Sequence, residues 1–378
     1  MKYKEIGDSL YIKGRIGWKG LKKSEYLKNS DYRIINGSNI FDNKIDWSNC
    51  GYISEERYNE SPEIMLQKGD ILITKDGTIG KVAMVSELKK PTTVASGLFV
   101  LRNTAPSKWD TKYIFNFLQS NKFKKFVFSR TEGSVIPHLY QKDFMTLEIP
   151  ELEINEQRKI AYRLDTIQHK LDLNNQINDN LDALLTTIFE KQINNKSFKE
   201  ANLTDIATYK NGLAMQKYRP KNNEKSLPVL KIRELNQGHT DDSSDRCSIK
   251  IDKNVIVNIG DIIFSWSGTL LVKNWSGKRA GLNQHLFKVT SNSYPDWFIY
   301  EWTKYYLRKF QSIAAGKATT MGHIKRSDLK SSKVRIPNES KLVELNTIMQ
   351  PLYDKRIEVI KENQQLIELK QVLLQKFF

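Results

Sequence analysis

The sequence predicts an α+β protein in which two similar mixed α/β domains are joined by two long antiparallel, coiled-coil-like helices. Two observations predict this class. Five landmarks recur in the same order in both halves of the chain, and each copy ends in a long segment whose apolar residues recur every three or four positions. The chain would travel out along one helix and back along the other, so a pseudo-two-fold axis would relate the copies. We expect one domain at 1–151 and a central helix at 152–195, then a second domain at 196–337 and a C-terminal helix at 338–378.

The clearest landmark is "GDILITKDGTIG" from Gly69 to Gly80, which returns as "GDIIFSWSGTLL" from Gly260 to Leu271. Both read Gly-Asp-Ile, an apolar stretch and then Gly-Thr. The other landmarks are a Leu-Phe pair, a Trp that opens a helical segment, a Gly-rich loop with a His that closes on Ile-Pro, and an Asn-Glu that opens the long helix. The copies share these framework positions and differ in their loops, as expected of two domains that bind different ligands on one scaffold.

The two long segments have the spacing of a narrow apolar seam. The predicted seam residues are Ile160, Leu164, Ile167, Leu171, Ile177, Leu181, Leu184 and Ile188 in the first helix, and Leu345, Ile348, Leu352, Ile360, Ile367 and Leu373 in the second. Each helix has a polar break near its middle, "NNQINDN" at 174–180 and "ENQQ" at 362–365. Polar residues in such a seam cost stability and can fix the register. The alternative is that each helix packs only on its own domain.

Composition indicates a polyanion as the partner. The chain of 378 residues has 60 Lys+Arg against 43 Asp+Glu, a formal net charge of +17. Such a charge favours nucleic acid first and an anionic membrane second, although Lys-rich composition also promotes solubility. The two cysteines, Cys50 and Cys247, are too few and too far apart for a disulfide framework or a cysteine metal site. No apolar run approaches the roughly 18 residues of a membrane helix, so we expect a soluble, cytoplasmic protein.

A search for catalytic motifs finds none with the required residues, spacing and surrounding secondary structure. "DGTIGK" has the Gly-x-x-Gly-Lys of a phosphate loop at the wrong spacing, and it runs into the strand-like "KVAMV" instead of a helix. No dinucleotide fingerprint, methyltransferase motif or nuclease constellation is evident, and the five histidines lack metal-ligand spacing, so no metal site is expected. An enzyme with an unrecognised nuclease or methyltransferase site stays open as the alternative.

The loops, in contrast, carry side chains suited to DNA. Asn, Gln, Arg and Lys can contact base edges, while Lys, Ser and Thr can hold phosphates. In the first copy the candidates are Lys19, Lys22, Lys23, Asn36, Ser38, Lys75, Asp76, Thr78, Ser96, Arg130, Ser134 and His138. In the second copy they are Lys210, Asn211, Lys217, Arg219, Lys231, Arg233, Ser265, Trp266, Ser267, Thr269, Asn283, Gln284, His285, Lys317, Thr319, Thr320, His323 and Lys325.

The residues between the framework positions of the hairpin turn are the ones that differ between copies. Lys75 and Asp76 correspond to Trp266 and Ser267. We expect these tips to be exposed and to approach DNA, with the Gly allowing close backbone contact. The alternative is a tight hairpin that only shapes the sheet.

The whole chain resembles the specificity (DNA-recognition) subunit of type I restriction–modification systems. The resemblance is carried by "GDILITKDGTIGKVAMV", "GLNQHLF", "PVLKIREL", the Ile-Pro ends and the helix "NEQRKIAYRLDTIQHKLDLNNQINDNLDALLTTIF". It implies that each domain reads one half of an asymmetric bipartite site in double-stranded DNA, with the helices setting the spacer. It also implies two modification (methyltransferase) subunits docked on the helices, and restriction (translocase/endonuclease) subunits that join the complex.

The resemblance implies no catalysis and no cofactor for this chain. S-adenosylmethionine, ATP and Mg would belong to the partner subunits. Other interpretations are the recognition part of a single-chain restriction enzyme, and a coiled-coil scaffold whose globular ends bind protein.

Overall fold

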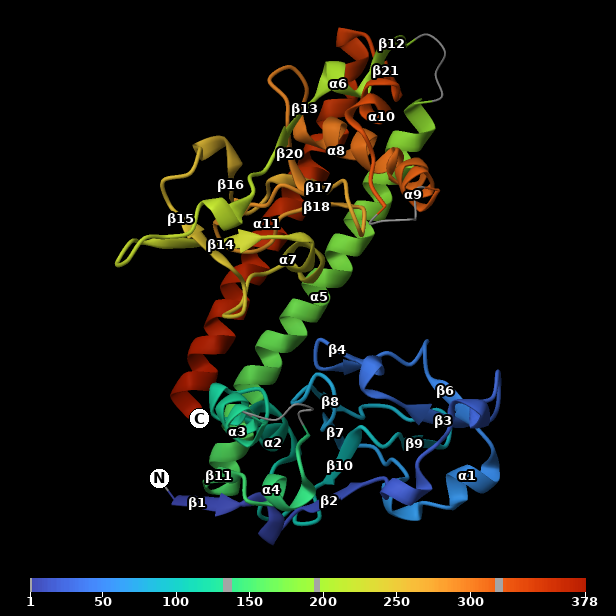
Figure 1. Cartoon of the computed structure of the whole chain (residues 1–378), viewed down its shortest axis with the longest axis vertical. Coiled ribbons are helices and arrows are strands. Elements are labelled where there is room, and N and C mark those ends of the chain that lie inside the picture. The colour runs from blue at the N-terminus through green and yellow to red at the C-terminus, as the bar shows by residue number, and fades with distance from the viewer. Residues whose placement is uncertain (1, 132–137, 194–197, 317–321) are drawn as a thin grey trace. The chain divides into compact units, whose positions relative to one another are not determined.

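The computed structural model describes residues 2–131, 138–193, 198–316 and 322–378 (Figure 1). It divides into two compact units. Unit 1 comprises Met1–His169 with Glu368–Phe378, and unit 2 comprises Lys170–Ile367. Each unit therefore contains one globular domain together with a part of both long helices.

The domain of unit 1 is a mixture of short strands and helices. Its elements are β1 (Lys2–Glu5), β2 (Tyr11–Gly14), β3 (Tyr32–Ile35), β4 (Ile40–Phe41), β5 (Lys44–Ile45), β6 (Gly51–Ile53), α1 (Glu55–Asn59), β7 (Ile71–Thr74), β8 (Val82–Met84), β9 (Thr92–Val94), β10 (Leu98–Arg102), α2 (Thr111–Phe117), α3 (Asn121–Thr131), α4 (Gln141–Met145) and β11 (Glu148–Glu151). The first long helix, α5 (Ile154–Ile193), follows.

The domain of unit 2 has the same kinds of element in nearly the same order. They are β12 (Lys199–Asn202), α6 (Leu203–Ile206), β13 (Thr208–Asn211), β14 (Ser226–Leu230), α7 (Ile232–Gln237), β15 (Arg246–Ser248), β16 (Ile256–Val257), β17 (Ile262–Ser265), β18 (Leu271–Asn274), β19 (Ala280–Leu282), β20 (Leu286–Thr290), α8 (Asp296–Tyr305), α9 (Leu307–Ala315), α10 (Arg326–Lys330) and β21 (Lys333–Ile336). The second long helix, α11 (Glu339–Phe377), completes the chain.

Sheet topology confirms that the chain is a tandem repeat. The four-stranded sheet has the order β2-β10-β7-β8 in unit 1 and β13-β20-β17-β18 in unit 2. A parallel pair lies beside it in each unit, β3 with β9 and β14 with β19. The first and last strands of each domain also pair, β1 with β11 and β12 with β21. The repeated landmarks therefore mark equivalent positions of one fold.

One inner strand of each four-stranded sheet, β7 in unit 1 and β17 in unit 2, is buried on both faces. In β7, Ile71 and Ile73 pack in the core beneath the helices, while Leu72 between them packs in a second core on the other side of the sheet. In β17, Phe264 packs in the core beneath the helices, and Ile263 packs in a second core on the other side of the sheet. This burial explains why both segments read as unbroken apolar runs instead of alternating with polar residues.

The Gly-Asp pair that precedes each central strand forms the same turn in both repeats. Gly69 and Gly260 have φ values of +92° and +93°, a region that favours glycine. The next residue's carboxylate accepts a hydrogen bond from the amide three residues earlier, Gln67 N to Asp70 Oδ2 and Asn258 N to Asp261 Oδ2, each 2.7 Å. The repeated Gly-Asp-Ile is therefore a structural motif.

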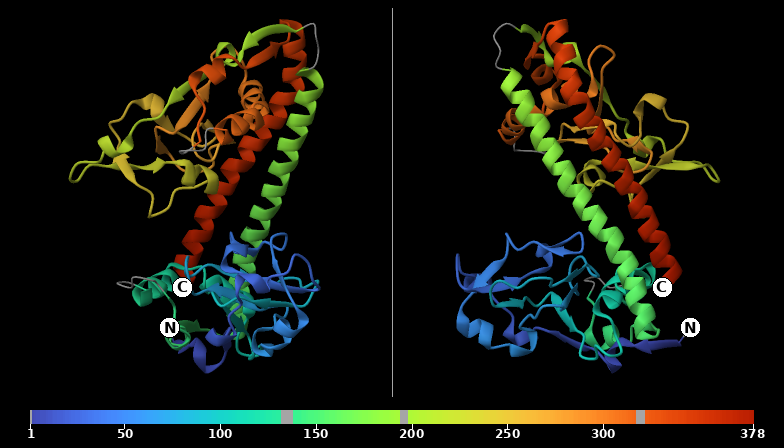
Figure 2. Two further views of the ribbon diagram at one scale, coloured as in Figure 1. Left: turned by 45° about the vertical axis from the view of Figure 1, so that its right-hand side comes forward. Right: turned by 180° about the vertical axis from the view of Figure 1, so that it is seen from behind.

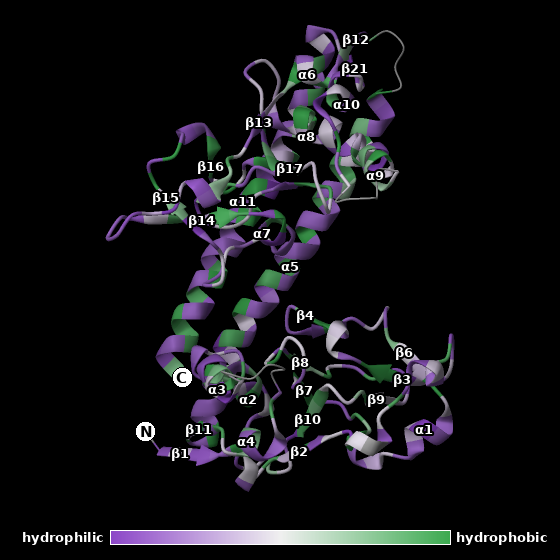
Figure 3. Cartoon of the chain, in the orientation of Figure 1, coloured by the Kyte–Doolittle hydropathy of each residue, from purple (hydrophilic) through white to green (hydrophobic). Residues whose placement is uncertain are grey.

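The long helices pair in antiparallel fashion within each unit. In unit 2 the later part of α5 lies beside the earlier part of α11 in both views of Figure 2. In unit 1 the Lys370 ammonium of α11 donates to the Gln168 side chain of α5 at 2.8 Å. Apolar and polar residues alternate along both helices (Figure 3), as expected of helices with one buried stripe.

Part of the predicted seam is buried, and of these residues Ile160, Leu164 and Leu345 belong to the cores of the globular domains. Ile160, Leu164, Ile167, Leu171, Leu345 and Ile360 are buried, and Leu181, Ile188, Leu352 and Leu373 are half-buried. The prediction is wrong for four residues, which are exposed: Ile177, Leu184, Ile348 and Ile367.

The seam of α5 runs through the asparagines of the predicted polar break. Three- and four-residue steps lead from Leu171 to Asn174, Asn178, Leu181 and Leu185, and Asn174 and Leu185 are buried. This register keeps the seam continuous, and it turns Ile177 and Leu184 outward. An apolar residue beside a seam was mistaken for a member of it.

A polar layer crosses the helix pair of unit 2 at this point. The Asn174 amide nitrogen donates to Glu362 Oε2 at 2.7 Å and to Asn363 Oδ1 at 2.9 Å. Asn363 in turn donates to Asn175 Oδ1 at 3.0 Å. These bonds form only in one register of the two helices, which is the use of seam asparagines that the sequence predicted.

A second polar junction joins the helices of unit 2 to their domain. The guanidinium of Arg356 on α11 donates to the Tyr300 hydroxyl of α8 at 2.8 Å and to the Asn274 side chain at the end of β18. The same guanidinium lies 3.4 Å from Asp182 of α5. One buried cation therefore ties both long helices to the domain.

Glu301 of α8 lies inside this junction. Its Oε2 accepts a hydrogen bond from the Thr186 hydroxyl at 3.0 Å, while Oε1 has no partner among the described residues. Burial raises the pKa of Glu301 from 4.5 to about 7, against the opposing effect of the nearby Lys304 and Arg356 cations.

We expect this carboxyl to make unit 2 less stable as the pH rises. The folded state holds the Glu301 proton more tightly than the unfolded chain, so its contribution is fully present below pH 4.5 and is lost by about pH 7. The loss across that window is about 3 kcal/mol. Glu301→Gln keeps the shape without the charge, so the melting temperature of the variant should exceed that of the wild type at pH 8 and match it near pH 4.5. Glu358→Gln, at an exposed position of α11, is the control. A variant that is less stable than wild type at pH 8 would contradict this view.

Candidate nucleic-acid interface

Five loops meet at one end of the sheet in unit 1, and backbone hydrogen bonds hold four of them together. The amide of Lys75, after β7, donates to the Gly97 carbonyl, before β10, at 2.9 Å. The amide of Ala95 donates to the Ile35 carbonyl at the end of β3, also at 2.9 Å. The amide of Leu139 donates to the Lys75 carbonyl at 3.0 Å, which brings in the loop that contains His138.

The same three bonds recur in unit 2. The amide of Trp266 donates to the His285 carbonyl at 3.3 Å, Asn283 N donates to Leu230 O at 3.0 Å, and Ile324 N donates to Trp266 O at 3.1 Å. We call the two sets of loops the loop clusters. Loop cluster 1 comprises residues 17–23, 36–38, 75–80, 95–97 and 138–139, and loop cluster 2 comprises 211–213, 231, 266–270, 283–285 and 322–325.

The Gly-Thr of each hairpin turn belongs to the framework. Gly77 and Gly268 have φ values of +66° and +67°, so both turns need the same left-handed residue. The residue before each glycine pairs with the histidine of the returning loop, Asp76 with His138 and Ser267 with His323. In unit 1 this pair also includes a side-chain contact between the Asp76 carboxylate and His138 Nδ1. The sequence did not predict that the hairpin and the histidine loop touch.

Two arginines, one buried and one half-buried, hold the basic loop of cluster 1, and sequence reasoning missed them. Arg15 is buried, and its guanidinium donates to the carbonyls of Val94 and Lys19. Arg57 donates to the carbonyls of Lys19 and Gly20. An arginine that directly follows an apolar strand, as in "YIKGRIGW", was the available signal.

The structure places most first-copy candidates around loop cluster 1. Asp76, Thr78, Lys22, Lys23 and Ser38 are exposed, and Asn36, Ser96, Lys19 and His138 are half-buried. Arg130 lies apart, exposed at the end of α3.

The expectation of an exposed tip is wrong for Lys75. Only 12% of its side chain is exposed, against 44% for Asp76, because its ammonium lies 5.5 Å from the centre of the Phe99 ring. The outward residue of the tip is therefore the carboxylate.

The second-copy candidates fall into two groups, those that lie around loop cluster 2 and those that lie outside it. Around loop cluster 2, Asn211, Lys231, Trp266, Gln284, His285 and His323 are half-buried, whereas Thr269 and Lys325 are exposed. Lys210, Lys217, Arg219 and Arg233 are exposed and lie outside the cluster. Ser134, Lys317, Thr319 and Thr320 lie outside the described residues.

Three second-copy candidates are buried. One of them is the tip residue Ser267, so the expectation that this residue is exposed is wrong. Ser265, Ser267 and Asn283 are at most 7% exposed. The side chains of Ser265 and Asn283 bond to the cluster's own backbone: the Ser265 hydroxyl donates to Ser267 O at 3.2 Å, and Asn283 Oδ1 accepts from His285 N at 3.3 Å.

Two basic candidates of this copy already have carboxylate partners. Arg233 donates to Glu234 and Asp241 and orders the loop between them, and the Lys231 ammonium pairs with Asp245. These contacts give both residues a structural role within the domain.

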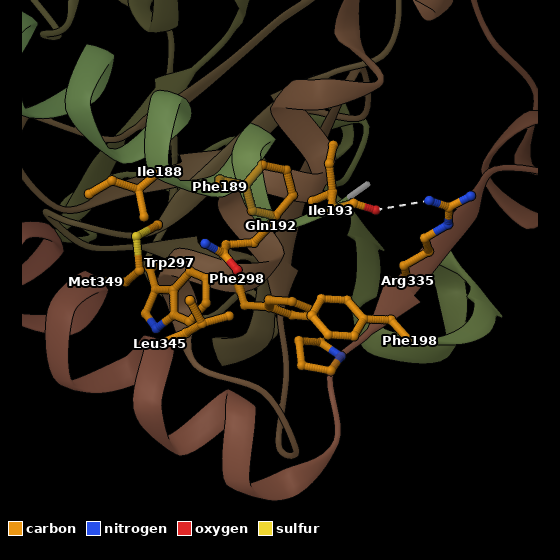
Figure 4. A pocket seen from close by; sticks show the side chains of 11 residues that line it. Ile188, Phe189, Gln192, Ile193, Phe198, Trp297, Phe298, Arg335, Leu345 and Met349 are labelled. Carbon is orange, nitrogen blue, oxygen red and sulfur yellow. Dashed lines mark hydrogen bonds between the residues drawn. The ribbon is translucent and has the colours of Figure 1, made fainter. Parts of the chain in front are cut away.

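An apolar pocket of unit 2 lies away from the loop clusters. Figure 4 shows Phe189 and Ile193 of α5 facing Trp297, Phe298 and Phe198, with Arg335 donating to the Ile193 carbonyl at 3.2 Å. Apart from Arg335 and Gln192 its lining is apolar, which suits packing between the helix end and the domain and offers no nucleophile or acid–base pair.

The tandem fold with two loop clusters is that of a DNA-recognition subunit. A family model described as "Type I restriction modification DNA specificity domain" matches residues 1–183 and again 195–370. The chain belongs to this family, whose members are the specificity subunits of type I restriction–modification systems and are non-catalytic parts of those complexes.

Particular relatives agree with this assignment. The chain is 24% identical over 360 residues to the type I restriction enzyme MjaIX specificity subunit of Methanocaldococcus jannaschii, covering 86% of this chain and 80% of the relative. It is 26% identical over 271 residues to the EcoKI specificity subunit of Escherichia coli, covering 65% and 57%. Its fold is similar to the crystal structure of the type I S subunit from M. genitalium, with a TM-score of 0.54, 16% identity and coverage of 100% and 96%.

No helix in the described part of the chain is both long and apolar enough to cross a membrane.

The exposed carboxylate of the first hairpin tip gives a test of loop cluster 1. We expect Asp76→Ala to weaken discrimination at one base position about tenfold, because a carboxylate accepts a hydrogen bond from the amino group of cytosine or adenine. Stability should fall by no more than about 1 kcal/mol, because the contacts of this carboxylate with His138 and Lys75 lie near the surface. The measurement is binding of the assembled complex to duplexes that differ at single positions.

Asp31→Ala is the matched control, since Asp31 is exposed just before β3, at the opposite end of that strand from the cluster. Unchanged discrimination by a stable Asp76→Ala protein would remove the contact.

Proposed function

We propose that each loop cluster reads one half of an asymmetric bipartite site in double-stranded DNA. The observation that carries the proposal is the pair of clusters itself, which share a backbone frame and differ in their side chains. Where cluster 1 has Lys75 and Asp76, cluster 2 has Trp266 and Ser267. A shared backbone frame that carries different side chains suits two domains that recognise different base sequences. The net charge of +17 supplies the attraction for the phosphates.

The long helices are proposed to set the spacer between the half-sites. α5 has 40 residues, which at about 1.5 Å per residue gives roughly 60 Å. That length accommodates two reading surfaces about one helical turn of DNA apart, about 34–36 Å. The polar layer at Asn174 supports this role, because a fixed register keeps the spacing constant.

The same helices are proposed to dock two modification (methyltransferase) subunits. Large apolar side chains are exposed on the helical parts of both units: Tyr162, Leu369 and Val372 in unit 1, and Leu173, Ile177, Leu184, Val343, Ile348 and Ile367 in unit 2. Exposed apolar residues in such number on two helices suit a protein interface more than solvent. The residues that were wrongly assigned to the seam thus belong to this surface.

Restriction (translocase/endonuclease) subunits are proposed to join the complex, which acts on DNA in the cytoplasm. S-adenosylmethionine, ATP and Mg would be bound by the partner subunits, and this chain would take no cofactor.

Genome-wide mapping of methylated bases in cells that carry the system tests the proposal. We expect a motif of two short defined sequences separated by unspecified bases. Replacing residues 1–151 with those of a family member of different specificity should change one half of the motif and leave the other half and the spacer intact. The reciprocal exchange of residues 196–337 is the control and should change only the other half. A single exchange that changes both halves, or the absence of a bipartite motif, would contradict the proposal.

A further inference from the structure

Loop cluster 2 holds a group of polar atoms whose hydrogen bonds are not made. Among the described residues, Asn211 Oδ1, Trp266 Nε1, Gln284 Oε1 and His285 Nδ1 are buried and have no hydrogen-bond partner. All four belong to loops that meet at the same end of the sheet. Each side chain as a whole is half-buried, so its unpaired atom is turned inward from a side chain that solvent can reach.

These side chains form one neighbourhood. The Trp266 ring lies 5.8 Å from the His285 ring and 5.8 Å from the Phe287 ring. Asn211 stands directly opposite Phe287 in the pairing of β13 with β20. Gln284 Nε2 lies 3.4 Å from His285 Nε2.

The shared frame does not require this group. In unit 1 the residue opposite Phe99, the equivalent of Phe287, is Gly14, and the residue that accepts the hairpin amide bond is Gly97. Glycines thus stand where unit 2 has Asn211 and His285. Lys75 occupies the place of Trp266 and lies against Phe99. The same fold therefore forms without the unpaired atoms.

Such atoms are costly in a folded protein. Leaving a buried donor or acceptor unpaired costs about 1–3 kcal/mol for each group. Four of them at the end of the sheet that carries the variable loops indicate bonds that a ligand completes.

We propose that a DNA base pair completes them, and that these four residues are the specificity-determining set of loop cluster 2. The proposal rests on the function proposed above. Rotation of the side chains on binding would turn the unpaired atoms toward the base edge.

The donors and acceptors identify the chemistry of the base. The Trp266 indole N–H can only donate, so it needs a ring nitrogen or carbonyl oxygen on the base. The amide oxygens of Asn211 and Gln284 can only accept, so they need an exocyclic amino group. In the major groove every base pair carries one amino group, on adenine in A·T and on cytosine in G·C, and each pair also carries acceptors for the indole N–H, so either pair can complete the set.

Two substitutions that preserve packing test the set. Trp266→Phe keeps a ring against His285 and Phe287 and removes the indole N–H, and Gln284→Met keeps the length and removes the amide. Methylated bases are mapped in cells whose system carries each variant. We expect the half of the motif read by residues 196–337 to become degenerate at one position, with discrimination there reduced about tenfold, while the other half is unchanged. The wild-type base pair at that position, A·T or G·C, identifies the ligand.

Trp302→Phe is the matched control. Trp302 also has an unpaired Nε1, but it lies in the core on α8, where its ring packs on Phe189, so the motif should be unchanged. A wild-type motif in both test variants would overturn the proposal and leave ordered water as the partner of these atoms. If Trp266→Phe abolishes methylation altogether, Gln284→Met decides, since a relaxed motif supports the proposal and an unchanged motif overturns it. Failure of the function itself is distinct, because the wild-type chain would then give no bipartite motif.

Discussion

One backbone hydrogen bond in each repeat underlies the arrangement of the loops. It runs from Lys75 N to Gly97 O in unit 1 and from Trp266 N to His285 O in unit 2. It fixes the hairpin against the neighbouring loop, and the hairpin carbonyl then accepts the amide that anchors the histidine loop. Because only backbone atoms take part, almost any side chain can occupy these positions. The frame is therefore constant while the chemistry displayed on it changes.

The sequence predicted the tandem fold well because the frame has strict local requirements. Gly69, Gly77, Gly260 and Gly268 adopt backbone conformations that favour glycine, so both copies show the same letters. The helix seam was predicted less well. Its register follows three- and four-residue steps through Asn174, and polarity alone suggested a break there.

The sequence indicated which loops carry the candidate residues, but it did not predict how their atoms lie. Which loops carry the variable polar residues follows from comparing the two copies. Whether a side chain points outward depends on neighbours from distant strands, as Lys75 shows by lying over Phe99. The unpaired atoms of loop cluster 2 were also beyond sequence reasoning, because an unpaired state depends on every surrounding donor and acceptor. The errors in the seam also concern which side chains are exposed. Ile177 and Leu184 were predicted to lie in the seam, but they are exposed on the helix surface that is proposed to dock partners.

The central claim is that one chain carries two domains, each of which recognises its own DNA half-site independently of the other. The most direct measurement is binding of the assembled complex to four duplexes, with both half-sites intact, either one altered, or both altered, over a range of salt concentrations. We expect the free-energy losses from altering the two halves to add. We also expect a steep salt dependence for every duplex, with each phosphate contact contributing about 0.9 to the log–log slope. Losses that fail to add at a fixed spacer, or an affinity that salt does not change, would contradict the central claim.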